Sequence, residues 1–306
     1  RAADRPRGAA VNAALPALVA PLRTIGRRTF DFSRRVAVMA IVNRTPDSFW
    51  DRGATFALDH AVSAALTAVD DGADWVDVGG VPFSPDTPAV SVAEEIDRVV
   101  PLVAAIAERS DVVISVDTTR APVAAAAIEA GASVVNDTNG ARDPEMVELL
   151  SEGRASVVVT HSVAPPHVHL PRPQYTDVVA EVVAFLRERV DTLTAAGVPA
   201  ERLFIDPGPD LNKNTVHTLE LLRRLPEVAA IGLPLLAAVS NKDFIGETLD
   251  RRPADRLPGT LAATTLAVAA GARVVRTHQV APTVDAVRLT EAVLGLREPA
   301  YLRHNM

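Results

Sequence analysis

An eightfold alternation of short apolar runs and helical stretches limits the folds open to this chain more than any other feature. From residue 36 onward, each run of β-branched and aliphatic residues ends in polar residues or glycine, and an alanine- and leucine-rich stretch follows. Runs that are apolar almost throughout are typical of parallel strands buried on both faces. The predicted strands are 36–43, 74–80, 112–118, 133–138, 155–162, 202–208, 234–240 and 273–278. The predicted helices are 57–71, 91–109, 120–130, 144–152, 175–196, 215–225, 254–270 and 283–296.

Eight strand–helix units in about 270 residues predict an α/β fold of the (β/α)8 TIM-barrel type, in a single domain. A doubly wound open sheet is the alternative, because it too is built from parallel strands. The first strand–loop–helix has no G-x-G-x-x-G and the chain has no G-x-x-x-x-G-K-[ST], which disfavours dinucleotide-binding and P-loop sites. We expect residues 1–30 to be an N-terminal extension and residues 31–300 to form the barrel.

Composition excludes several classes of protein. The 306 residues include no cysteine, so disulfides, thiolate metal sites and a cysteine nucleophile are ruled out. A formal charge of −7 gives no overall basic field, so we expect no nucleic-acid partner. The sequence contains no apolar stretch long enough to span a membrane, and we expect a cytoplasmic protein. Of the 31 basic residues two are lysines, Lys213 and Lys242, and their positions therefore invite attention.

Polar side chains stand where the apolar runs stop. They are Asn43, Asp77, Asp117, Asn136 with Asp137, His161, Asp206, Lys242, Arg276 and His278. In a (β/α)8 barrel the C-terminal strand ends carry the chemistry. One such residue alone would be read as a helix cap, but a set that follows nearly every strand predicts a binding site.

The charges in this set are sorted along the chain. Carboxylates and amides follow the middle strands, while Lys242, Arg276 and His278 follow the last two, where barrels of this type commonly bind phosphate. The three cationic side chains could hold an anion such as phosphate or pyrophosphate. The carboxylates and amides could hydrogen-bond a flat, nitrogen-rich heterocycle.

Seven motifs stand in order along the chain, namely VMAIVNRTPDSF, GADWVDVGG, ISVDTTRAPVAAAAIEAGASVVND, IDPG, VSNKDFIGE, ADRLPGTLAA and RVVRTHQV. Together they resemble the dihydropteroate synthase family, and the match extends from about residue 36 to about residue 295. The resemblance implies a (β/α)8 barrel, usually a homodimer. It also implies a reaction that joins p-aminobenzoate to 6-hydroxymethyl-7,8-dihydropterin pyrophosphate, with Mg²⁺ assisting the release of pyrophosphate.

The resemblance also implies roles for individual residues. Motif by motif, the pterin pocket would consist of Asp117, Asn136, Asp206 and Lys242. The pyrophosphate site would consist of Asn43, Arg276 and His278, with Asn43 near the Mg²⁺. The implied partner is pterin pyrophosphate or a related small anionic ligand.

The sequence departs from the family on the p-aminobenzoate side, where Phe83, Ser84, Leu211 and Ser240 would lie. The family's usual Thr-Arg pair after the second strand is Phe83-Ser84, which removes a cation and a hydroxyl. Losing one charge-assisted contact costs about 1.5–3 kcal/mol. Ser240 itself is kept.

Further departures lie in the last third of the chain. The family's Ile-Gly-Phe-Gly-Lys after the sixth strand is replaced by 209–213, so an aromatic residue becomes Leu211 and two glycines are lost. Ser-Arg-Lys becomes Ser240-Asn241-Lys242, and His-Asp becomes His278-Gln279. The first signature has Arg44 where a small valine is usual.

These departures favour a homologue whose synthase activity is impaired or absent and whose pterin and pyrophosphate pocket is largely retained. An active, divergent dihydropteroate synthase is one alternative, since loops can be replaced by other solutions. A non-catalytic pterin- or anion-binding barrel is another. A further alternative keeps the barrel but changes the chemistry, as in the pterin-binding domains of corrinoid methyltransferases. No motif of a cobalamin domain accompanies it here.

Overall fold

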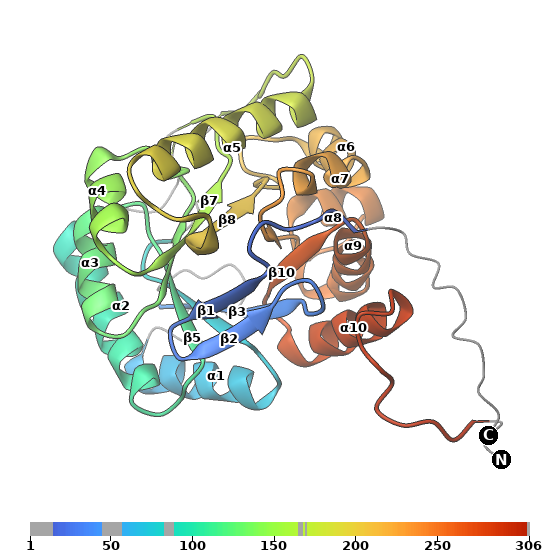
Figure 1. Ribbon diagram of the computed structural model, residues 1–306, viewed down its shortest axis with the longest axis horizontal. Coiled ribbons are helices and arrows are strands. Elements are labelled where there is room, and N and C mark those ends of the chain that lie inside the picture. The colour runs from blue at the N-terminus through green and yellow to red at the C-terminus, as the bar shows by residue number, and fades with distance from the viewer. Residues whose placement is uncertain (1–14, 45–56, 83–88, 165–167, 169, 305–306) are drawn as a thin grey trace.

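Eight parallel strands form a closed barrel in the computed structural model, which describes residues 15–44, 57–82, 89–164, 168 and 170–304 (Figure 1). The strand order around the barrel is β10-β3-β4-β5-β6-β7-β8-β9. The bounds are β3 Ala37–Asn43, β4 Trp75–Gly79, β5 Val113–Asp117, β6 Val134–Asp137, β7 Ser156–Thr160, β8 Leu203–Asp206, β9 Leu235–Ala237 and β10 Ala272–Thr277. All eight predicted strands are confirmed, and with them the (β/α)8 barrel.

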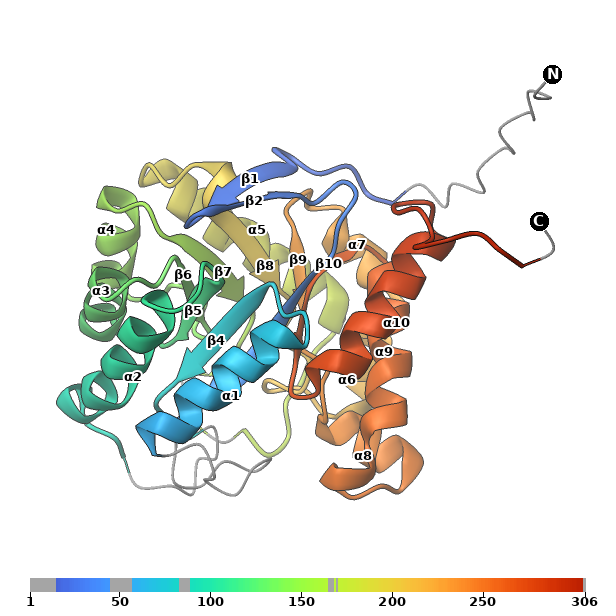
Figure 2. The same cartoon turned by 90° about the horizontal axis from the view of Figure 1, so that it is seen from below.

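Helices surround the barrel on its outer side (Figures 1 and 2). Their bounds are α1 Leu58–Asp70, α2 Val92–Ala107, α3 Ala121–Glu129, α4 Pro144–Glu152, α5 Val178–Ala195, α6 Thr215–Arg223, α7 Leu225–Ala229, α8 Asp243–Leu249, α9 Leu257–Ala269 and α10 Val280–Val293. The short helix α8 was not predicted, because its seven residues are too few to show a helical period. No helix in the described part of the chain is long and apolar enough to cross a membrane.

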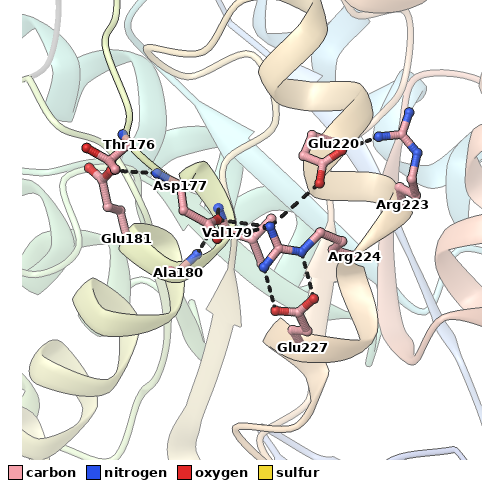
Figure 3. A network of polar contacts seen from close by, with 9 residues as sticks. All are labelled: Thr176, Asp177, Val179, Ala180, Glu181, Glu220, Arg223, Arg224 and Glu227. Carbon is pink, nitrogen blue, oxygen red and sulfur yellow. Dashed lines mark hydrogen bonds and ion pairs between the residues drawn. The ribbon is translucent and has the colours of Figure 1, made fainter.

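The predicted helix 215–225 is interrupted at Arg224, which caps α6 and precedes α7. Its guanidinium donates to both carboxylate oxygens of Asp177, at the start of α5, at 3.0 and 3.1 Å, and to Glu227 at 2.7 and 2.8 Å. Asp177 in turn accepts from two backbone N–H groups in the first turn of α5 (Figure 3). One arginine thus joins α5 to the α6–α7 junction at the surface.

A two-stranded antiparallel hairpin, β1 (Leu22–Ile25) and β2 (Arg28–Asp31), lies across the N-terminal end of the barrel (Figure 2). Phe30 and Phe32 on its inner side are buried. The Phe32 ring is 5.6 Å from Phe204, and Phe204 is 5.2 Å from Trp75 inside the barrel. The hairpin was not predicted, and the boundary expected between residues 30 and 31 falls inside β2.

The inside of the barrel changes from apolar to polar along its axis. Trp75, Val113 and Val134 belong to the same inner apolar cluster as the hairpin phenylalanines. Side chains alternate between the two faces of a strand, so residues two positions further on also face inward. The resulting layer is polar and consists of Asp77, Ser115, Asn136, Thr160, Asp206 and Arg276. The alternation therefore places an apolar plug at one end of the barrel and a polar floor below its mouth.

Candidate functional site

The predicted site residues gather around one end of the barrel, opposite the hairpin. Because all strands are parallel, their C-terminal ends point away from β1 and β2 (Figure 2). Asn43, Asp117 and Asp206 are the last residues of β3, β5 and β8. β10 is parallel to β3, and Arg276 is the second-last residue of β10, so Arg276 also lies toward the C-terminal ends of the strands.

Arg276 joins two carboxylates across the barrel. Its Nε donates to Oδ2 of Asp77 at 2.6 Å, and its Nη2 donates to Oδ2 of Asp117 at 2.9 Å. Asn136 adds a second donor to Asp77, from Nδ2 to Oδ2 at 3.0 Å. Burial alone would lower the pKa of Arg276, but attraction to the two carboxylates outweighs it and raises the pKa. In this arrangement the charge of Arg276 is balanced by the protein itself.

Two buried carboxyl groups at strand ends have raised pKa values. Burial raises the pKa of Asp117 to about 7, with Arg276 opposing the rise and Asp77 adding to it. Burial also raises the pKa of Asp137 to about 7, although backbone N–H donors to its carboxylate oppose the rise. Oδ1 of Asp137 accepts from the N–H of Asn139 at 2.7 Å. Of the two, Asp117 bonds to Arg276 inside the barrel, whereas Asp137 follows the inward-facing Asn136 and therefore lies on the outer face of β6.

Asp206 and Lys242 form a second charged group. Oδ1 of Asp206 accepts the N–H of Gly208 at 2.7 Å, and burial raises the pKa of Asp206 while Lys242 opposes this. Lys242 precedes α8, and its ammonium donates to the carbonyl of Pro209. Burial lowers the pKa of Lys242, and the carboxylates of Asp210 and Asp206 act in the opposite sense.

The loops after β9 and β10 are joined by side chains. Ser240 Oγ lies 3.0 Å from Nδ1 of His278 and accepts the backbone N–H of His278 at 3.2 Å. Asn241 Nδ2 donates to Oε1 of Gln279 at 3.3 Å. Asn241 and Gln279 both depart from the family pattern, so these two changes fall on one contact.

The loop between β8 and α6 approaches the chain closely at Gly208. This glycine has a φ of +61°, and a Cβ there would lie 2.2 Å from the carbonyl oxygen of His161. Asp210 and Asn212, at the two positions where the family has glycine, have φ values of 61° and 48°. Aspartate and asparagine tolerate this left-handed region better than other L-residues. The two losses of glycine thus leave the backbone in conformations that glycine favours.

Lys213, at the end of the same loop, is buried among three acceptors. Its Nζ lies 2.9 Å from Nδ1 of His161 and donates to the carbonyls of Gly208 at 2.9 Å and Leu211 at 3.1 Å. A compact ammonium can satisfy three convergent acceptors, whereas a planar guanidinium cannot. Burial lowers the pKa of Lys213 to about 7, and burial together with Lys213 lowers that of His161 to about 2. Lys213 therefore fixes the loop from within.

The structure adds residues to the predicted set and leaves some outside it. Phe83 and Ser84 lie outside the described residues. Leu211 is partly buried in the β8–α6 loop. Asp77 was noted as a strand end but given no role. It pairs with Arg276, which is 199 residues away in the sequence. The rarity of lysine had singled out Lys213, although not its buried contacts.

Arg44 forms hydrogen bonds with helix α2. It donates from Nη1 to the carbonyls of Asp97 at 3.0 Å and Arg98 at 2.9 Å, both in α2. Arg98 in turn donates to the carbonyl of Gly80 at 2.8 Å. The first departure from the family signature thus ties the start of the β3–α1 loop to a neighbouring helix.

Comparison with known proteins finds relatives that match most of the chain. A family model described as pterin binding enzyme matches residues 39–278. "Inactive dihydropteroate synthase 2" of Mycobacterium tuberculosis (strain ATCC 25618 / H37Rv) is 46% identical over 271 residues, covering 87% of this chain and 85% of that protein. "Dihydropteroate synthase" of Escherichia coli (strain K12) is 40% identical over 261 residues, covering 85% and 93%.

Solved structures agree with the sequence comparison. Dihydropteroate synthase of Xanthomonas albilineans with 4-aminobenzoic acid superposes with a TM-score of 0.82 at 39% identity, over 89% of this chain and 98% of that one. The Yersinia pestis enzyme with a sulfonamide drug complex gives a TM-score of 0.85 at 35% identity, over 90% and 100%. This chain therefore belongs to the dihydropteroate synthase family of pterin-binding enzymes.

Proposed function

We propose that the protein is a dihydropteroate synthase homologue that binds a pterin pyrophosphate at the barrel mouth and has lost most or all synthase activity. The observation that carries this proposal is the contrast around the mouth. The strand-end residues that match the family's pterin side are present and converge. On the second-substrate side, two residues that differ from the family pattern, Asn241 and Gln279, form a hydrogen bond with each other.

The pterin side supports binding of a flat heterocycle. Asp117, Asn136 and Asp206 would supply acceptors and an amide for ring nitrogens and the exocyclic amine, and Lys242 a donor for the ring carbonyl. Among described residues, buried oxygens of this polar layer lack a protein partner, namely Oδ1 of Asp77, Oγ of Ser115 and Oγ1 of Thr160. Such orphaned atoms call for water or a ligand. A related structure holds 7,8-dihydropteroate in the Xanthomonas enzyme.

The charge balance supports a role for Mg²⁺ with the pyrophosphate. Arg276 already faces two carboxylates, and Lys242 is near Asp206. A pyrophosphate would therefore meet little uncompensated positive charge from these groups. Asn43 Oδ1 would be 2.9 Å from a Cβ built on Gly79, which places this oxygen over the end of β4. Magnesium accepts such an oxygen together with water and substrate phosphates. In this proposal Asn43 holds the ion, with His278 and Arg276 beside the pyrophosphate.

The second-substrate side supports the loss of activity. The family's aromatic residue is Leu211, and the cation of its Thr-Arg pair is missing at Phe83-Ser84. Two or three lost transition-state contacts of about 1.4 kcal/mol each would slow the reaction a hundred- to a thousandfold. Mycobacterial relatives at 44–46% identity carry the name inactive dihydropteroate synthase 2.

A titration and an assay test the proposal together. The purified protein is titrated with 6-hydroxymethyl-7,8-dihydropterin pyrophosphate and Mg²⁺ by calorimetry, and turnover is then measured with p-aminobenzoate. We expect Mg²⁺-dependent binding and turnover at least a hundredfold below an ordinary enzyme rate of about 1 per second. Turnover at that ordinary rate would establish the active-synthase alternative instead.

Absence of binding would reject the pterin pocket. Binding of inorganic pyrophosphate without any pterin preference would favour the anion-binding barrel. The double variant Phe83→Thr with Ser84→Arg sharpens the assay, because a gain of turnover would assign the defect to that pair. No gain would shift it to the β8–α6 loop.

We also propose that the protein is a cytoplasmic homodimer that associates through α9 and α10. Apolar side chains on the outer faces of these helices are well exposed, with Leu266 and Leu289 at 68% and Val293 at 78%. Small residues in α9, such as Ala262 and Ala269, permit close packing. Light scattering at micromolar concentration should give twice the chain mass, and Leu289→Glu should shift it toward the monomer.

A further inference from the structure

The β8–α6 loop is fastened on two sides by residues that stand at left-handed positions. Asp210 Oδ1 accepts the hydroxyl of Thr218 in α6 at 2.8 Å, and its Oδ2 accepts the N–H of Phe244 in α8 at 3.1 Å. Asn212 Oδ1 accepts Oγ of Ser162 at 2.7 Å and the N–H of Ala164 at 3.0 Å, both in the loop after β7. One loop is thereby attached to three neighbouring segments.

The fastened loop also holds Lys242. The ammonium of Lys242 donates to the carbonyl of Pro209, the residue directly before Asp210. Phe244, two residues after Lys242, has an N–H in the first turn of α8 with no partner inside the helix, and Asp210 accepts it. Asp210 therefore acts on both partners of the Lys242–Pro209 hydrogen bond. It binds the start of α8, which carries Lys242, and it directly follows Pro209, which supplies the accepting carbonyl.

We propose that Asp210 and Asn212 are positioning residues that immobilise the β8–α6 loop and thereby hold the Lys242 ammonium at the barrel mouth. The inference rests on the proposed function for its consequence in ligand binding. Both residues adopt positive φ, which glycine adopts without strain. Replacement by glycine thus removes the side-chain contacts and leaves the backbone path accessible, whereas alanine would add strain.

Two amide protons report the loop contacts directly. Hydrogen exchange resolved by NMR should show the Phe244 amide exchanging about tenfold faster in Asp210→Gly, with Ala164 unchanged. In Asn212→Gly the pattern should reverse. Asp250→Gly is the matched control, because Asp250 also has a positive φ, of 52°, at the exposed end of α8. It should leave both amides as in the wild type.

Lysine labelling reports the position of Lys242 without any ligand. The chain has two lysines, so trinitrophenylation by trinitrobenzenesulfonate, in which the amine displaces sulfite from the ring, can be assigned to Lys242 or Lys213 by peptide mass. We expect Asp210→Gly to raise the labelling rate of Lys242 about fivefold, because the released amine is more exposed to the reagent and has lost the Asp210 carboxylate, which favours its charged form. An unchanged rate, with the Phe244 amide accelerated, would overturn the positioning role.

Binding completes the test. The Kd for 6-hydroxymethyl-7,8-dihydropterin pyrophosphate with Mg²⁺ should rise about five- to tenfold in Asp210→Gly and stay at the wild-type value in Asp250→Gly. A wild-type protein that fails to bind this ligand would remove the proposed function, while the labelling result would still decide the positioning role. Faster labelling with an unchanged Kd would overturn the link between the loop and binding.

Discussion

The two ends of this barrel use the same strands for opposite purposes. At the hairpin end, Phe30, Phe32, Trp75 and Phe204 pack ring against ring with almost no exposed surface. At the mouth, the next inward layer carries buried carboxylates, an arginine and oxygens that lack protein partners among described residues. Apolar burial stabilises, whereas buried charge costs free energy unless it is paired. The apolar packing inside the barrel is thus concentrated at one end and its charged groups at the other.

The largest expected effect is on stability, at the hairpin end. Trp75→Ala should lower the free energy of unfolding by about 3–5 kcal/mol, because it leaves a cavity below the hairpin. Trp75→Phe is the matched control, since it keeps a ring and removes an indole N–H that has no partner in the described structure. Urea denaturation measures both. A loss as large in Trp75→Phe as in Trp75→Ala would show that ring packing is not the cause.

The second effect is at the mouth. Arg276→Ala should lower the free energy of unfolding by about 2–3 kcal/mol at pH 8, because Asp77 and Asp117 lose their shared cation. The loss should be smaller at pH 5, where a raised pKa lets Asp117 take up a proton. Arg276→Lys keeps the charge and should recover part of the stability. A loss that does not vary with pH would contradict the ionic role of Arg276.

The third effect isolates the titration of Asp117. Burial raises its pKa to about 7 from 3.8, so the folded state binds more protons than the unfolded state between these values. Its contribution to stability therefore falls as the pH rises through that window. Asp117→Asn removes this titration, so the stability of the variant relative to the wild type should increase by on the order of 1–3 kcal/mol from pH 4 to pH 7. A constant difference would reject the raised pKa. The variant should also bind the pterin ligand more weakly.

The smallest effect is expected on the surface of the helix layer. Arg224→Ala removes the contacts to Asp177 and Glu227 between α5 and the α6–α7 junction (Figure 3). Exposed ion pairs contribute little and are screened by salt. We expect a slight drop of the melting temperature that disappears in high salt, and no change in ligand Kd. A drop that persists in high salt would mean that Arg224 acts through packing.

The sequence by itself determined the barrel and the set of residues around its mouth. Strand and helix periods are local, so the eight units could be identified without knowledge of their neighbours. Parallel strands bring their C-terminal ends together, which was enough to group Asn43, Asp117, Asp206 and Arg276 at one end. The motifs of the resemblance then identified the family, which the comparisons confirmed.

Only the tertiary structure showed which charged groups pair with each other and which segments are held by side-chain contacts. Arg276 and Asp77 are 199 residues apart, and nothing local indicates that they pair. The hairpin was missed because the apolar pattern in residues 22–31 is too short to indicate strands. Its apolar side chains are buried against the barrel interior, and this packing is visible only in the folded chain. The substitutions at Asp210 and Asn212 looked in the sequence like losses of glycine. In the folded chain both residues keep a positive φ, and their side chains bind three other segments. The sequence could not indicate these contacts, because a side chain's partners lie on chain segments that only folding brings together.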